Sequence, residues 1–101
     1  RRDRQVKSRG YRIELGEVET ALLGLAGVTA AVVEAWPHPD IGTELVAWVE
    51  TDSVAPATAL EAALRRQLPA YMLPAHWHLL AALPRTSTGK IDRQQLHKGS
   101  L

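Results

Sequence analysis

The chain has 101 residues, of which 46% are hydrophobic and none is cysteine. This length suits one domain with a modest core, and the hydrophobic share is that of a globular protein rather than a disordered one. The lack of cysteine excludes a disulfide framework and a thiolate metal site. No apolar run is long enough for a membrane span, and no signal peptide opens the chain, so we expect no membrane partner.

The formal net charge is only +1, but it is unevenly spread, because residues 1–12 hold six basic residues against one acidic residue, a balance of +5. This basic stretch could face an anion, such as a phosphate, a coenzyme or another domain, or it could be a solvated linker. Both interpretations stay open at this point. No DNA- or RNA-binding motif accompanies the charge, so we expect no nucleic-acid partner.

The first predicted elements are a hairpin and a helix. Residues 5–13 contain strand formers on both sides of a turn at Gly10, which predicts a short hairpin. Residues 14–25 then change to helical spacing, and their apolar stripe predicts core packing. The stripe consists of Leu15, Val18, Leu22 and Leu25.

Residues 28–36 and 45–49 are rich in Val and Trp and predict two strands. The segment between them predicts a loop, because it is punctuated by Pro37, Pro39, Asp40 and Gly42. Neighbouring strands joined in this way indicate an antiparallel pair. Both strands are apolar on both faces, so we expect helices to cover the sheet.

The second predicted helix follows a linker at residues 53–57. Thr58 and Glu61 have the spacing of a capping box, which places the helix start at Thr58, and Pro69 ends it. Its buried stripe consists of Leu60, Ala63, Leu64 and Leu68.

Residues 68–74 form a rigid connector between two prolines, with Tyr71 and Met72 expected to fill the core. Residues 76–80 predict a third strand. His76 and His78 share one face of that strand, but there is no cysteine and no acidic pair at ligand spacing, so we expect no metal site.

A turn-rich loop then carries Lys90. Pro84 stiffens its beginning, and Gly89 gives the backbone freedom directly before the charge. The loop is not a phosphate-cradling P-loop, because Pro84 stands where the first glycine of that motif belongs and Ile91 follows the lysine. Lys90 would act as a single positive charge that reaches outside its own domain.

The order of hairpin, helix, two strands, helix, strand, loop and short helix predicts an α+β fold: a small three-stranded sheet covered by helices, with an N-terminal two-stranded hairpin. The last helix runs from Arg93 to about His97 and is capped by Asp92. No nucleophile elbow and no paired carboxylates are present. A complete active site cannot be assembled from these residues, so Lys90 needs a pocket that another domain supplies.

Three segments together resemble the C-terminal subdomain of an adenylate-forming enzyme, in particular that of a nonribosomal peptide synthetase adenylation domain. Residues 1–19 are similar to the eighth core motif of that family, residues 68–74 to the ninth, and residues 88–93 to the tenth. The run Ile13-Glu14-Leu15-Gly16-Glu17 favours the peptide-synthetase branch over the acyl-CoA ligases. The resemblance implies that residues 1–97 are the lid subdomain and residues 98–101 a linker or cloning remnant.

The resemblance also implies roles for single residues. Asp3 would be the hinge, and Lys90 would be the catalytic residue that bridges the amino-acid carboxylate and the α-phosphate of ATP. Lys7, Gly10 and Arg12 would form a thiolation face beside the phosphopantetheine of a peptidyl carrier protein. ATP and Mg²⁺ would be bound mainly by the N-terminal adenylation subdomain, and the amino-acid substrate there as well.

The sequence departs from the family pattern at Thr88, where asparagine is usual, and at Ser8, where an aliphatic residue is common; neither change removes a charge. We expect a cytoplasmic ligase of which this fragment alone is inactive. The alternatives are a carrier-protein docking module and the adenylation lid of an acyl-CoA ligase.

Overall fold

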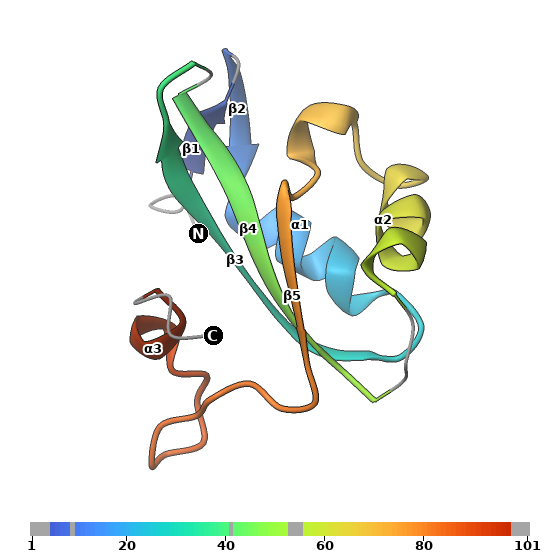
Figure 1. Ribbon diagram of the computed structural model, residues 1–101, viewed down its shortest axis with the longest axis vertical. Helices are drawn as coiled ribbons and strands as arrows, with labels where there is room; N and C mark the ends of the chain where they lie inside the picture. The colour runs from blue at the N-terminus through green and yellow to red at the C-terminus, as the bar shows by residue number, and fades with distance from the viewer. Residues whose placement is uncertain (1–4, 9, 41, 53–55, 98–101) are drawn as a thin grey trace.

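A computed structural model describes residues 5–8, 10–40, 42–52 and 56–97 of the chain. The α+β prediction is confirmed: a two-stranded hairpin precedes a three-stranded sheet, and helices pack on that sheet (Figure 1). The strands are β1 (Gln5–Ser8), β2 (Tyr11–Glu14), β3 (Val28–His38), β4 (Gly42–Thr51) and β5 (His76–Leu80). The helices are α1 (Leu15–Leu23), α2 (Ala57–Arg65), the 3₁₀ turn η2 (Ala70–Met72) and α3 (Arg93–His97).

Strand β4 lies at the centre of the three-stranded sheet, antiparallel to β3 and parallel to β5. The predicted loop between β3 and β4 is much shorter than expected, because β3 continues through Pro37 to His38 and β4 already begins at Gly42. Pro37 pairs with Thr43. A proline is tolerated there because β3 is an edge strand, where the missing N–H leaves no neighbouring strand without a donor.

Each face of the sheet has its own core. One core joins α1 and α2 to one face of the sheet, through the buried side chains Val18, Leu22, Leu60, Leu64, Leu45, Ala47 and Val49. On the opposite face, Leu83 and Leu96 cover Val32, Val46 and Trp48. Figure 1 shows α3 on the side of the sheet away from α1 and α2. The segment after β5 therefore wraps to the second face, which explains why β3 and β4 are apolar on both sides.

The predicted capping box at the start of α2 is wrong. Helix α2 begins at Ala57, Pro56 is its N-cap, and no side chain caps it. Thr58 consequently lies inside the first turn, two residues beyond the N-cap position from which a hydroxyl can accept a free backbone N–H. The apolar stripe is nevertheless as predicted, with Leu60 and Leu64 buried and Ala63 and Leu68 packed against the same core.

The connector between α2 and β5 contributes both predicted residues to the core. Met72 is buried, and the partly buried Tyr71 packs against the same core. Tyr71 also stacks on Tyr11 of the hairpin, with ring centroids 4.0 Å apart and an interplanar angle of 10°. No helix in the described part of the chain is long and apolar enough to cross a membrane.

Candidate functional site

The lysine loop folds as a tight hairpin of its own. Arg85 and Ile91 form an isolated antiparallel bridge, the Thr86 N–H donates to the Lys90 carbonyl at 2.7 Å, and the Gly89 N–H donates to the Thr86 carbonyl at 2.9 Å. Gly89 has φ +90°, a left-handed conformation that favours glycine. The chain therefore reverses sharply and presents the next residue, Lys90, at a defined place.

The Lys90 side chain is exposed. Its ammonium group forms no hydrogen bond or ion pair with any residue that the structure describes. An amine left in water on a braced turn is available to a ligand or to another domain. This agrees with the prediction that the charge reaches outside its own fold.

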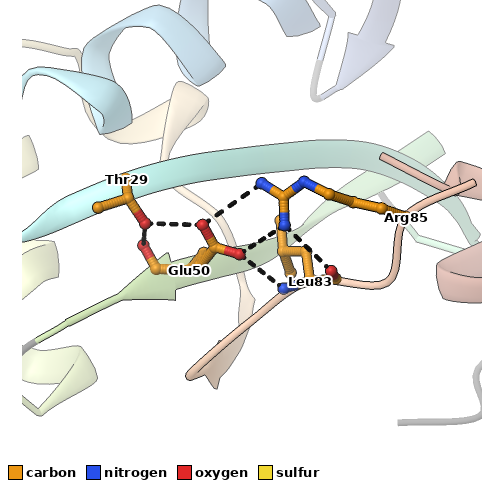
Figure 2. A network of polar contacts seen from close by, with 4 residues as sticks. All are labelled: Thr29, Glu50, Leu83 and Arg85. Atoms are coloured by element: carbon orange, nitrogen blue, oxygen red, sulfur yellow. Dashed lines mark hydrogen bonds and ion pairs between the residues drawn. The ribbon is translucent and has the colours of Figure 1, made fainter. Parts of the chain in front are cut away.

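The first arm of the loop is anchored to the sheet by the carboxylate of Glu50, at the end of β4 (Figure 2). This carboxylate accepts hydrogen bonds from the Leu83 N–H at 2.9 Å and from the Arg85 Nη1 at 2.9 Å. It also accepts one from the Thr29 hydroxyl at 2.8 Å, so that β3, β4 and the loop meet at one side chain.

These contacts stabilise the ionised form of Glu50 and lower its pKa from 4.5 to about 2. The hydrogen bond from Arg85 has the largest effect, followed by those from the Leu83 N–H and from Thr29. The Glu50 side chain is 12% exposed, whereas that of Arg85 is 39% exposed. The carboxylate is therefore a charged anchor near neutral pH, and its counter-charge stands at the surface.

The second arm of the loop is anchored through α3. Asp92 accepts the Gln95 N–H at 3.2 Å, which confirms the predicted cap, and Leu96 is fully buried against the sheet. Arg93 then reaches two carboxylates, Glu19 of α1 at 3.2 Å and Glu34 of β3 at 3.4 Å. These ion pairs hold α3 against the edge of the sheet.

Besides its ion pair with Arg93, Glu19 accepts a backbone hydrogen bond from strand β3. It is a buried residue on α1, and its Oε2 accepts the N–H of Val33 at 2.7 Å. Strand β3 lies at an edge of the sheet, so the carboxylate satisfies a backbone donor that has no neighbouring strand there. Arg93 neutralises this buried charge, which makes the contact favourable.

The predicted thiolation face lies on the β1–β2 hairpin. Lys7 and Arg12 are directly opposite each other in the register and are both exposed, so they share one face. Gly10 has φ +84°, and an added Cβ would meet no atom within 4 Å. Asp3, the predicted hinge, lies outside the described residues.

The hairpin is fastened to the beginning of β4, where the Ser8 hydroxyl donates to the Thr43 carbonyl at 2.8 Å. Thr43 and Glu50 are seven residues apart on one strand, which corresponds to about 23 Å at roughly 3.3 Å per residue. The lysine loop and the hairpin therefore occupy opposite ends of the domain, as Figure 1 shows.

The histidine pair takes part in local packing. His76 Nε2 lies 3.1 Å from a Glu44 carboxylate oxygen, and the His78 ring stacks on Trp48 with centroids 5.6 Å apart. Within the described ranges, no group of three or more His, Cys, Asp or Glu side chains could hold a metal ion.

Sequence reasoning missed Glu50, Arg85 and Glu19 as anchoring residues. In the sequence, Glu50 is visible only as an acidic residue at the end of an apolar strand, and Glu19 only as an acidic residue beside the apolar stripe of α1. Their arginine partners are distant in the sequence. Arg85 and Arg93 were visible within the lysine stretch, but their partners are 35 and 74 residues away.

Comparisons with known proteins identify this arrangement. Residues 17–90 match the family described as AMP-binding enzyme C-terminal domain. The chain is 52% identical over 98 residues to chondramide synthase of Chondromyces crocatus and 45% identical over 96 residues to tyrocidine synthase 3 of Brevibacillus parabrevis. Each alignment covers 95% of the chain, which spans only 2% of the length of each relative.

The fold matches that of an acyl-CoA synthetase from Brucella canis with a TM-score of 0.82 at 34% identity. That match covers 98% of this chain and 19% of the synthetase. Because the family match covers well over half of the sequence and the structural match covers nearly all of it, the chain belongs to the family of AMP-binding enzyme C-terminal domains.

Proposed function

We propose that this domain is the mobile C-terminal lid of an ATP-dependent, adenylate-forming ligase that activates an amino acid, as part of a nonribosomal peptide synthetase. The observation that carries the proposal is Lys90: an exposed cation on a loop braced at both ends, whose ammonium group bonds to no residue that the structure describes. The similarity to peptide synthetases at 45–52% identity supports the amino-acid branch.

In the first half-reaction, a carboxylate oxygen of the amino acid attacks the α-phosphate of ATP and pyrophosphate leaves. Negative charge is concentrated on the non-bridging oxygens of the α-phosphate as the bond forms. Lys90 would stand between the carboxylate and the α-phosphate and stabilise this charge, an effect that typically contributes about 3–4 kcal/mol, or roughly 10²–10³ in rate. The larger N-terminal subdomain would supply the pocket.

Mg²⁺ would be held by that subdomain and the nucleotide. The described part of this chain contains no cluster of metal-ligating side chains, so its contribution to charge stabilisation is the amine. Lys90 fits an anionic oxygen well, because a lysine ammonium group is a compact charge with three rotatable donors.

In the second half-reaction, the thiol of carrier-protein phosphopantetheine attacks the acyl carbon of the aminoacyl adenylate, so that a thioester forms and AMP leaves. The hairpin with Lys7, Gly10 and Arg12 would then face the active site. The hairpin and the Lys90 loop are attached at opposite ends of β4, at Thr43 and Glu50, which are about 23 Å apart at roughly 3.3 Å per residue, so we infer that one pocket receives them in turn. The domain would therefore rotate between the steps, with Asp3 as the hinge.

The test is Lys90→Ala in the full-length enzyme. We expect ATP–pyrophosphate exchange to fall by about 10²–10³, while thioester formation from a supplied aminoacyl adenylate stays within twofold. Arg66→Ala is the matched control, because Arg66 is an exposed cation beyond the end of α2, and it should leave both rates unchanged. Equal losses in both half-reactions with Lys90→Ala would refute the proposal.

A further inference from the structure

The first arm of the Lys90 loop is held by a carboxylate at the end of the central strand. Glu50, on β4, bonds through one side chain both to this arm and to Thr29 of β3. It contacts backbone and side chain of the loop together, through the Leu83 N–H and the Arg85 guanidinium. Two donors of different kinds restrict both the position and the direction in which this arm leaves the sheet.

The effect of that anchor passes directly to Lys90. Arg85 is bridged to Ile91, and the Asp92 N–H donates to the Pro84 carbonyl at 2.8 Å, so the two arms move together. The turn between them is closed by the bond from the Thr86 N–H to the Lys90 carbonyl. A shift of Arg85 therefore shifts the backbone that carries the amine.

We propose that Glu50 is a positioning residue for adenylate formation, which holds the Lys90 amine in the position and orientation that the reaction needs. This inference rests on the proposed function of Lys90. Glu50 would not touch the substrate; it would act through Arg85 and Leu83. Displacements of about 1 Å in a positioned group can change rates about 10²-fold, so loss of the anchor should be visible in the rate.

The inference predicts a selective defect. The hairpin that would serve thioester formation is attached to β4 through Thr43 and stacks on Tyr71, and neither residue bonds to Glu50. A variant that loosens only the lysine loop should therefore slow adenylate formation and spare the transfer step. A variant that merely destabilises the domain should slow both.

The decisive variant is Glu50→Gln in the full-length enzyme, because glutamine keeps the shape of the side chain and removes the charge that Arg85 needs. ATP–pyrophosphate exchange would be driven by whichever amino acid from a panel of proteinogenic and common non-proteinogenic ones gives the fastest wild-type rate. We expect kcat for exchange to fall at least tenfold with KM for ATP within twofold, while transfer from a supplied adenylate stays within twofold.

Three further variants make the test more specific. Arg85→Gln should reproduce the defect, and the double variant should be no slower than either single one, because both changes break the same contact. Glu61→Gln is the matched control, since Glu61 forms a comparable ion pair with Arg65 at 3.3 Å on α2, and it should leave both half-reactions unchanged.

The outcomes separate this inference from the proposed function. If Lys90→Ala abolishes exchange but Glu50→Gln leaves it within twofold of the wild type, the inference is wrong and the proposed function stands. If Glu50→Gln slows both half-reactions equally, Glu50 is structural and the inference is also wrong. If Lys90→Ala itself has no effect on exchange, the proposed function fails and the inference fails with it.

Discussion

The Glu50 anchor should make the stability of this domain depend on pH in a way that one substitution removes. The pKa of Glu50 falls from 4.5 to about 2 on folding. A folded-state pKa below the unfolded value means that the unfolded chain takes up the proton first as pH falls. The contribution is therefore fully present above about pH 4.5 and is lost between there and about pH 2.

The size of the effect follows from the contacts. At about 1.4 kcal/mol per pH unit, the full difference would correspond to about 3 kcal/mol. The Arg85 guanidinium is 39% exposed, however, so water and salt screen the strongest of the three interactions. We therefore expect the anchor to contribute about 1–2 kcal/mol to the free energy of unfolding near neutral pH.

Urea unfolding of the 101-residue chain, followed by tryptophan fluorescence, measures this quantity, because the chain has three tryptophans to report on its sheet. Wild type and Glu50→Gln should differ by about 1–2 kcal/mol at pH 7, and the difference should shrink towards zero as pH approaches 2. A difference that stays constant from pH 7 to pH 2.5 would show that the charge of Glu50 contributes nothing, and would refute this reasoning.

Substitutions at three other residues test features of the fold outside the Glu50 anchor. Arg93→Ala should destabilise the domain by about 2 kcal/mol in urea unfolding, because it removes the charge-assisted hydrogen bond that Arg93 donates to the largely buried carboxylate of Glu19; Arg93→Lys should recover part of that loss. Gly10→Ala should cost about 1 kcal/mol, because φ is +84° there while the space for a methyl group is open, and it should slow thioester transfer more than adenylate formation. Tyr71→Ala removes the ring that stacks on Tyr11, so amide hydrogen exchange of the hairpin should accelerate while that of α1 stays as in the wild type; unchanged exchange in the hairpin would contradict this.

Much of the fold could be predicted because the apolar pattern within each short segment indicates whether that segment forms a helix or a strand. The apolar stripe of α1 has the helical period, the apolar run of β4 consists largely of strand-forming residues, and Asp92 caps α3 where its side chain and spacing suggest. The errors occur where tertiary context decides. Pro37 ends no strand because β3 is an edge strand, and Thr58 caps no helix because the N-cap of α2 is Pro56, two residues earlier.

In the candidate site, too, residues with a local sequence signal could be predicted, whereas residues defined by distant contacts could not. Lys90 could be singled out because a lysine after glycine in a turn-rich stretch is a local feature; the structure shows that it is exposed, and its catalytic role stays a prediction. Glu50 could not be found, because nothing near it in the sequence reveals that Arg85 folds back onto it. The roles of Lys7, Gly10 and Arg12 stay predictions, and so does that of Asp3.

Strand β4 anchors both the β1–β2 hairpin and the Lys90 loop, although neither segment is adjacent to β4 in the sequence. This matters for anyone who builds hybrid synthetases by exchanging parts of such domains. A crossover placed between β4 and β5 would join the Glu50 of one parent to the residue 85 of another, and a parent without an arginine there would leave the carboxylate unmatched. Crossovers outside residues 29–93 keep the anchor and the loop from a single parent.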